Sequence, residues 1–428
     1  GLSHMYDIFS LPEFKFPKGF LWGSGVAGHQ VEGNNIHSQY WWDENNTDKY
    51  EEKSGMACNQ YNMYREDAGL LKKLGHQAFR FSVEWSRIEP SEGNFNEEAI
   101  SHYADELAAL KEKGIKTFVT LVHFTVPLWF ERLGGFRKAE NLKYFRRYVK
   151  KIVPRICRYV DFWNVINEFN LGNTEEKIAH KLNSVIYHAE GYHIIKEHTD
   201  SPVSSAHALV YYMPYRAFDK FDRIMTDYRD WQDNEFFFHA IRTGEIVYPG
   251  KDVRFCRDVK GTCDYWSVNC YVRDMIDSRK ASGSGERYAH KVLKMIDMPF
   301  YLEEMYPEGM LSILTRLTDL PVYITENGCS CNDDRFRIVY LSLYLSALSD
   351  AIRCGIDVRG YLYWSLMDNY EWGSYKPKFG LTAVDRKTFE RKLKPSAMFY
   401  REIIENNGLN QEIIRRYLSE MPSLSLKA

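Results

Sequence analysis

The sequence predicts an α/β protein: a single (β/α)8 TIM barrel that binds its ligand at the C-terminal face of the strands. Eight short apolar runs alternate with segments whose apolar residues recur at helical spacing, which indicates repeated β/α units. Polar residues end nearly every run, whereas a doubly wound sheet would gather them at one switch point. No Pro-, Gly- or Ser-rich linker interrupts the middle of the chain, so we expect residues 6–428 to form one domain after a cloning scar at residues 1–5.

The elements of the first half follow a strand–helix rhythm. The first strand, residues 20–27, is apolar and aromatic, with glycines that allow its end to bend. Helices at residues 64–74 and 97–113 have apolar residues at helical spacing and stop at Gly75 and Gly114. The same patterns predict strands at residues 78–85, 116–123 and 160–168, and helices at residues 141–157 and 175–198.

The second half continues this rhythm after one interruption. A short strand at residues 202–207 is followed by a longer, mixed region in which we predict no regular element. The remaining predicted strands are residues 265–271, 322–325 and 360–366, and the remaining helices are residues 310–317, 335–354 and 396–406.

Composition narrows the function classes. The 428 residues are 44% hydrophobic and carry a net charge of −2, without the basic excess of a nucleic-acid-binding protein. No stretch approaches the roughly 20 apolar residues that span a membrane, so we expect neither nucleic acid nor membrane as a partner. The residues after the scar lack the apolar core of a signal peptide, although they do not say whether a leader once preceded them.

The eight cysteines are dispersed and form no CxxC pair, which favours free thiols in a reducing cytoplasm. Cys329 and Cys331 lie close in sequence, but no nearby His or Cys completes a metal-binding set. We therefore expect neither a metal nor another cofactor.

Two strand-like runs end in a carboxylate. One is the run through Ile324 and Thr325 to Glu326, and the other ends in Asn167 and Glu168. A single strand-end Glu can merely cap the following helix, but two in matching settings favour paired acid chemistry. Glycosidic bond cleavage uses such a pair, in which one acid gives a proton and the other attacks or activates water.

The other strand ends carry amides, one His and several aromatic residues, a set that suits a sugar. Hydroxyl groups need directional hydrogen-bond partners, and the C–H faces of a sugar stack on aromatic rings. No GxSxG nucleophile motif accompanies them. The strand-end residues are Gln30, Arg80, His123, Asn167, Glu168, Asn269, Tyr271, Glu326, Trp364, Glu371 and Trp372.

The sequence resembles glycoside hydrolase family 1, the β-glucosidase family. Residues 324–328 (Ile-Thr-Glu-Asn-Gly) resemble the nucleophile motif of that family, and Asn167-Glu168 resembles its acid/base motif. Further matches, from about residue 14 to residue 405, include residues 30–33, 79–82, 86–88, 120–123, 364–372, 379–381 and 384–385. The resemblance implies that residues 6–428 form a single catalytic domain.

The resemblance also implies residue roles in a retaining β-glycosidase that hydrolyses glucosides, or else galactosides or fucosides. Glu326 would be the nucleophile and Glu168 the acid/base, which requires Glu168 to be protonated near neutral pH. Arg80, Asn269 and Tyr271 would orient Glu326. The implied sugar-binding residues are Gln30, His123, Asn167, Trp364, Glu371, Trp372 and Phe379.

The departures from the family pattern fall mostly on the leaving-group side. Phe124 replaces the Trp of a His-Trp pair, Asn170 replaces an aromatic residue, and the segment 171–180 is short. A Trp expected shortly before residues 306–309 is missing. We therefore expect a more open leaving-group site, lined by residues drawn from Phe124, Trp129, Phe169 and Tyr301.

Two alternatives remain. A 6-phospho-β-glycosidase would bind a phosphate near Lys376 and Lys378, but Glu371 would repel a phosphate dianion at short range. A non-catalytic sugar-binding protein on the same barrel is the other, although both carboxylates are present. The sequence does not fix the oligomeric state, and a homo-oligomer is compatible with it.

Overall fold

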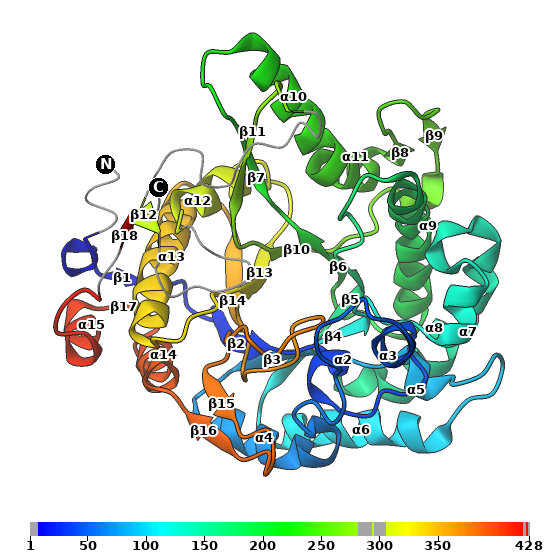
Figure 1. Ribbon diagram of the computed structural model, residues 1–428, viewed down its shortest axis with the longest axis horizontal. Coiled ribbons are helices and arrows are strands. Elements are labelled where there is room, and N and C mark those ends of the chain that lie inside the picture. The colour runs from blue at the N-terminus through cyan, green and yellow to red at the C-terminus, as the bar shows by residue number, and fades with distance from the viewer. Residues whose placement is uncertain (1–6, 281–292, 295–304, 423–424, 427–428) are drawn as a thin grey trace.

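The structure is a computed structural model, which describes residues 7–280, 293–294, 305–422 and 425–426. Its centre is a closed barrel of parallel strands (Figure 1), which confirms the predicted (β/α)8 architecture. Each of the eight barrel strands overlaps the run that the sequence predicted for it. In order around the barrel they are β2 (Leu21–Gly25), β3 (Ala78–Ser82), β4 (Lys116–Val122), β5 (Phe162–Asn167), β6 (Val203–Ala208), β10 (Trp266–Asn269), β13 (Val322–Asn327) and β14 (Val358–Trp364), which pairs with β2.

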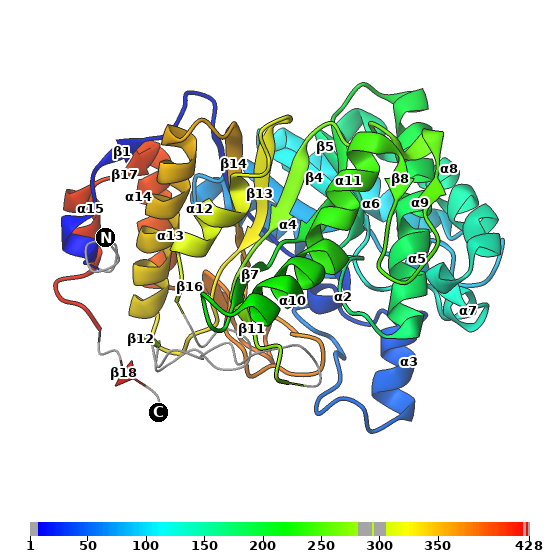
Figure 2. The same ribbon diagram turned by 90° about the horizontal axis from the view of Figure 1, so that it is seen from above.

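Helices cover the outside of the barrel, as Figures 1 and 2 show from two directions. The seven predicted helices all form. They are α4 (Gln60–Lys73), α6 (Glu97–Glu112), α8 (Leu142–Ile156), α9 (Glu175–His198), α12 (Glu308–Leu314), α13 (Arg335–Arg353) and α14 (Pro395–Asn406). Side-chain caps fix two of their starts: Asn96 accepts from the amides of the first turn of α6, and Thr174 accepts from Lys177 N at the start of α9.

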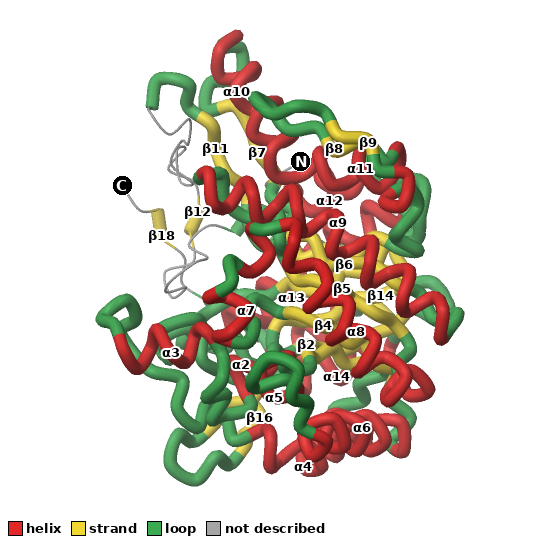
Figure 3. Tube along the Cα trace, turned by 90° about the vertical axis from the view of Figure 1, so that its right-hand side faces the viewer, coloured by secondary structure: helices red, strands yellow, loops and turns green. Residues whose placement is uncertain are grey.

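The mixed region after β6 forms structure that the sequence did not predict. It contains α10 (Lys220–Asp230), a π-helical turn η5 (Trp231–Glu235) and α11 (Phe236–Thr243) in direct succession. Strand β7 (Tyr211–Pro214) pairs in parallel with β11 (Arg273–Ile276), beyond the ends of β6 and β10. Figures 1 and 3 show β7, β11 and α10 together at one edge of the molecule, outside the barrel.

The remaining elements are short. They are η1 (Ile8–Ser10), β1 (Phe14–Lys15), α2 (Gly28–Val31), α3 (Gln39–Asn46), α5 (Trp85–Ile88), α7 (Leu128–Arg132), η2 (Gly135–Arg137), η3 (Ala139–Asn141), η4 (Cys157–Tyr159), β8 (Glu245–Ile246), β9 (Arg254–Phe255), η6 (Arg257–Val259), β12 (Leu293–Lys294), β15 (Thr382–Val384), β16 (Arg391–Leu393), β17 (Gly408–Leu409), α15 (Gln411–Tyr417) and β18 (Ser425–Leu426). None of the described helices combines the length and apolar character that crossing a bilayer requires.

A layer of aromatic side chains fills the N-terminal half of the barrel interior. Phe118 and Phe162 stack with ring centroids 4.2 Å apart, and Tyr265 and Tyr323 pack around them. This layer fills the barrel interior and leaves the opposite, C-terminal end of the strands, where barrels of this kind bind their ligands.

Three strands have an irregular pairing near that C-terminal end, although β13 also shifts register at its start, between Val322 and Tyr323. The register shifts between Val268 and Asn269 in β10, between Asn164 and Asn167 in β5, and between Ile324 and Asn327 in β13. Such irregularities re-aim side chains at strand ends. They occur on the three strands that bear or precede Glu168, Asn269 and Glu326.

Candidate active site

A pocket of about 290 Å³ opens at the C-terminal ends of the barrel strands. Among the predicted site residues, those that line it are Gln30, His123, Glu168, Asn269, Tyr271, Glu326, Trp364, Glu371, Trp372 and Phe379. The other two, Arg80 and Asn167, are fully buried and hydrogen-bond to residues of the pocket. The structure therefore brings all the predicted site residues together.

Three donors surround the carboxylate of Glu326, at the end of β13. Nη1 of Arg80 lies 2.5 Å from Oε2, and Nδ2 of Asn269 lies 3.0 Å from the same oxygen. The hydroxyl of Tyr271 donates to Oε1 across 2.5 Å. An ion pair with a guanidinium and two further hydrogen bonds fix both carboxylate oxygens in place.

The amide of Asn269 also reaches the second carboxylate. Its Nδ2 lies 2.7 Å from Oε2 of Glu168 as well as 3.0 Å from Oε2 of Glu326. The hydroxyl of Thr325 donates to Oδ1 of Asn269 across 2.7 Å, which orients the amide nitrogen towards the two acids. Because both carboxylate oxygens contact the same nitrogen atom, the distance between them cannot exceed the sum of these two nitrogen–oxygen distances.

Glu168 follows β5 in a backbone conformation with a φ of 50°. Its amide nitrogen donates to the carbonyl of Ala206 in β6, which holds this left-handed residue against the neighbouring strand. Loss of solvation, and then the negative charge of Glu326, raise the pKa of Glu168 to about 8. The side chain is therefore largely a neutral acid at pH 7.

Two buried polar atoms in the pocket have no partner among the described residues: Oε1 of Gln30 and Nδ1 of His123. Burial, and then the charge of Arg80, lower the pKa of His123 well below its ordinary value, so the ring is neutral. Asn167 Nδ2 lies 3.2 Å from Nε2 of His123, and an amide nitrogen can only donate. The ring proton consequently sits on Nδ1, where it is available to a ligand oxygen.

Aromatic rings form the flat walls of the same half of the pocket. His123 lies nearly parallel to Trp364 and to Trp372, with centroids 6.0 and 6.2 Å away. Phe124 meets Trp372 edge to face, 5.3 Å away. Flat rings beside unpartnered polar atoms suit a sugar, which offers both C–H faces and hydroxyl groups.

A third carboxyl group, Glu371, lies in this half of the pocket. Its Oε2 accepts from Nε2 of Gln30 across 3.1 Å. Desolvation, followed by the charges of Glu326 and Glu168, raises the pKa of Glu371 to about 8. Lys376 pairs instead with Glu51, and the ammonium of Lys378 donates to the carbonyl of Tyr375.

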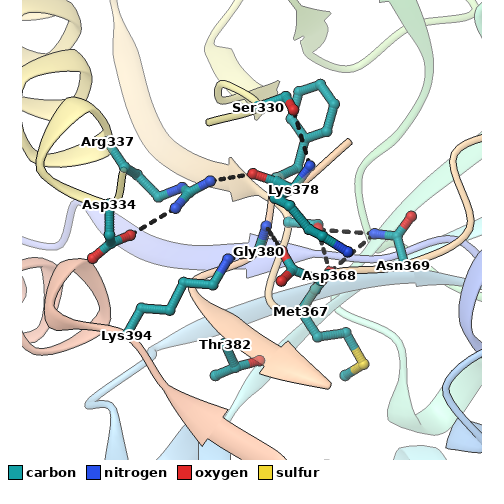
Figure 4. Close-up of polar contacts among 12 residues, drawn as sticks. Ser330, Asp334, Arg337, Met367, Asp368, Asn369, Lys378, Gly380, Thr382 and Lys394 are labelled. Atoms are coloured by element: carbon teal, nitrogen blue, oxygen red, sulfur yellow. Dashed lines mark hydrogen bonds and ion pairs between the residues drawn. The ribbon is translucent and has the colours of Figure 1, made fainter. Parts of the chain in front are cut away.

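The loop between β14 and β15 carries Glu371 and Trp372, and polar contacts near its two ends hold it in place. Figure 4 shows these contacts. Asp368 accepts from Nζ of Lys394 and from the amide of Gly380, each across 2.8 Å. Arg337 donates to the carbonyl of Lys378 and pairs with Asp334. These bonds tie both ends of the loop to the body of the barrel.

The leaving-group side differs from the sequence prediction. Trp129 donates to the carbonyl of Glu89 and packs on Trp85, away from the pocket, and Phe169 is buried against Phe237. The prediction that either residue lines the site was wrong. Phe124 does line the pocket, and Tyr301 lies outside the described residues.

Aliphatic residues that the sequence analysis did not single out line this side instead. They are Leu171, Ala208, Leu209, Val210 and Val272. Each lies at or shortly after the end of β5, β6 or β10, so position at a strand end was the one signal that could have found them. Their side chains carry no chemistry that distinguishes them from core residues.

Asn170 fastens the loop that bears Leu171. Its Nδ2 donates to the carbonyls of Ala208 and Asp233, each across 2.8 Å, and its Oδ1 accepts from Ala208 N. The π-helical turn η5 supplies Asp233, so the unpredicted segment after β6 supports the loop that follows Glu168.

All eight cysteines carry free thiols. Within the described ranges, no three His, Cys, Asp or Glu side chains are grouped so that they could hold a metal ion.

Known proteins resemble this chain in sequence and in fold. Residues 13–409 match glycosyl hydrolase family 1. Beta-glucosidase A of Acetivibrio thermocellus is 28% identical over 93% of this chain and 100% of its own length. A β-glycosidase from Pyrococcus horikoshii is similar in structure, with a TM-score of 0.84 and 32% identity over 95% of this chain and 98% of its own. A family 1 β-glucosidase from Thermotoga maritima, solved in complex with isofagomine lactam, gives a TM-score of 0.84 at 26% identity, over 93% of this chain and 100% of that one. The chain therefore belongs to glycosyl hydrolase family 1.

Proposed function

We propose that this protein is a retaining β-glycosidase that hydrolyses β-glucosides by double displacement, with β-galactosides or β-fucosides as related substrates. The observation that carries the proposal is the pair of carboxylates that share the amide of Asn269. Retaining glycosidases need their two carboxyl groups about 5–5.5 Å apart, whereas inverting enzymes leave about 6.5–9.5 Å for a water molecule. A shared amide nitrogen favours the closer spacing.

In the first step, Glu326 attacks the anomeric carbon while Glu168 gives its proton to the glycosidic oxygen. The C–O bond to the leaving group breaks, its electron pair stays on that oxygen, and an alcohol departs. The pKa of about 8 keeps Glu168 protonated for this task at neutral pH. Arg80 and Tyr271 hold the attacking carboxylate in position through its two oxygens.

In the second step, water replaces the enzyme at the anomeric carbon. Ester formation removes the negative charge of Glu326, which was one of the two causes of the raised pKa of Glu168. Glu168 can then stay ionised and accept a proton from the attacking water. The bond between the sugar and Glu326 breaks, the carboxylate returns, and two inversions give net retention.

The sugar-binding half of the pocket favours an unphosphorylated sugar. Oε1 of Gln30 and Nδ1–H of His123 offer one acceptor and one donor to hydroxyl groups, and Trp364 offers a ring face. A phosphate would find both nearby lysines engaged elsewhere, and the carboxyl group of Glu371, which accepts from Gln30, offers no positive charge to bind it. These contacts argue against the 6-phospho-β-glycosidase alternative.

Hydrolysis of an aryl β-glucoside by the Glu326→Gln and Glu168→Gln variants tests the proposal. Each should lose most turnover, whereas Glu106→Gln, a buried carboxylate on α6 outside the pocket, should retain it. A 2-fluoro glucoside should leave a covalent adduct on Glu326, visible by mass spectrometry of the digested protein. Full activity in either active-site variant, or an adduct elsewhere, would refute the assignment, and faster turnover of a 6-phosphoglucoside would favour the alternative.

A further inference from the structure

The walls of the pocket differ in polarity on the two sides of the carboxylate pair. Side chains at or beyond the ends of β2, β4 and β14 form one half, which holds Gln30, His123, Glu371 and the two tryptophans. Side chains that follow β5, β6 and β10 form the other half. Because Glu168 would protonate the departing oxygen, the half on its side receives the leaving group.

Apart from Glu168, Asn269 and Tyr271, that second half is aliphatic. Leu171 follows Glu168 by three residues, Val210 follows β6, and Val272 follows β10. Leu171 is 42% exposed, and Val210 and Val272 are half-buried. Three hydrocarbon side chains from three strand ends thus face the space next to the acid/base group.

The polar groups behind this wall are already engaged. Asn170 uses its amide on Ala208 and Asp233. Asn173 donates to Asp233 and accepts from Lys181 and Tyr248. The hydroxyl of Tyr271 donates its hydrogen bond to Glu326. Among the described residues that line this half, none therefore offers an uncommitted side-chain hydrogen-bond group to a second sugar.

Resting on the proposed function, we propose that the substrates are β-glycosides of apolar alcohols, with an alkyl or aryl leaving group, and that disaccharides are poor substrates. A sugar leaving group would lose hydrogen bonds to water against this wall without replacing them. A hydrocarbon leaving group would instead bury apolar surface, at about 0.8 kcal/mol for each methylene that leaves water.

An n-alkyl β-glucoside series tests this proposal, because the leaving alcohols from ethanol upwards differ little in acidity. We expect kcat/KM to rise with chain length, by up to about fourfold for each methylene that the wall buries. The kcat/KM for octyl β-glucoside should exceed that for cellobiose by at least about tenfold. A flat series, or faster turnover of cellobiose, would overturn the proposal. Absence of turnover with every glucoside, aryl glucosides included, would instead refute the glycosidase activity itself.

A pair of matched variants separates the wall from general effects. Leu171→Asn should reduce kcat/KM more for octyl than for methyl β-glucoside and so flatten the series. Leu133→Asn changes a leucine of nearly equal exposure, 41%, that ends α7 outside the pocket, and should leave the slope as it is. If Leu171→Asn lowers kcat/KM equally for octyl and for methyl β-glucoside, the leucine does not recognise the leaving group.

Discussion

Nδ2 of Asn269 lies 2.7 Å from Oε2 of Glu168. This bond favours the ionised form of Glu168, against the desolvation and the charge of Glu326 that favour the neutral acid. The same nitrogen contacts Glu326, so one amide connects the group that should give a proton to the group that should attack. The pKa of Glu168 therefore depends on a residue that has no charge of its own.

The first prediction concerns the pH dependence of the wild-type enzyme and of Asn269→Ala. Because Glu168 must be protonated in the first step, kcat/KM should fall as the pH rises through about 8. Removing the Asn269 amide removes a hydrogen bond to the ionised form, so the alkaline limb should move to higher pH. The kcat/KM of Asn269→Ala should also be lower at every pH, because Glu326 loses a hydrogen-bond donor as well.

The measurement is kcat/KM for one aryl β-glucoside from pH 5 to pH 10. The Glu168→Gln variant serves as the control, since its residual activity should lack this alkaline limb. A limb that moves to lower pH in Asn269→Ala would contradict the assignment of Glu168.

The second prediction is that Tyr271→Phe lowers kcat/KM by roughly ten- to a hundredfold. The lost bond joins a hydroxyl to a charged carboxylate, and such bonds contribute about 1.5–3 kcal/mol. Tyr265→Phe is the matched control, because its hydroxyl donates to the carbonyl of Trp163 in the lower barrel layer. It should lower the Tm with little effect on kcat/KM, and equal kinetic losses in both variants would refute a specific role for Tyr271.

Strand periodicity and strand-end chemistry made much of the molecule predictable. The eight barrel strands are short apolar runs with clear boundaries, and residues such as Glu326 and His123 stand out because polar groups are unusual at the end of a buried run. The segment of α10, η5 and α11 was missed. There one helical stretch passes through a π-helical turn, which disrupts the 3.6-residue pattern that sequence analysis relies on.

The leaving-group wall was beyond the reach of sequence analysis for a different reason. Leu171 and Val210 have no chemical signature, and only the folded chain shows that they face the pocket. Trp129 and Phe169 were predicted there because aromatic side chains often line sugar sites. Sequence alone does not say which way a ring points: Phe169 is buried against Phe237, and the half-buried Trp129 packs on Trp85 outside the pocket.

The third prediction concerns the buried ion pair of Lys181 and Asp233, which supports the loop after Glu168. Nζ of Lys181 is fully buried and lies 2.8 Å from the carbonyl of Gln232 and 3.1 Å from Oδ1 of Asp233. Lys181→Met should destabilise the protein by about 3–5 kcal/mol, because it leaves a buried carboxylate without its cation. Thermal unfolding should show a Tm several degrees lower.

Two further variants test whether the pair is the cause. Lys181→Met combined with Asp233→Asn should be less destabilised than the sum of the single changes, since no unpaired charge remains. Lys251→Met breaks an exposed pair with Glu175 and should cost about 0–1 kcal/mol. An additive double variant would show that the two side chains act independently.

The fourth prediction is that Glu371→Gln stabilises the protein at high pH. The folded-state pKa of Glu371, about 8, exceeds its ordinary value of 4.5, so the folded protein holds a proton that the unfolded chain releases. Wild-type stability should therefore decline as the pH rises from about 4.5 to about 8, and the glutamine variant should escape this decline. We expect its Tm to exceed that of the wild type by roughly 1–3 °C at pH 8.5, with the difference shrinking towards pH 5. Glu405→Gln, on the exposed face of α14, should show no such trend, because Glu405 pairs with Arg401 in solvent. A Tm difference that is the same at pH 5 and pH 8.5 would contradict the raised pKa of Glu371.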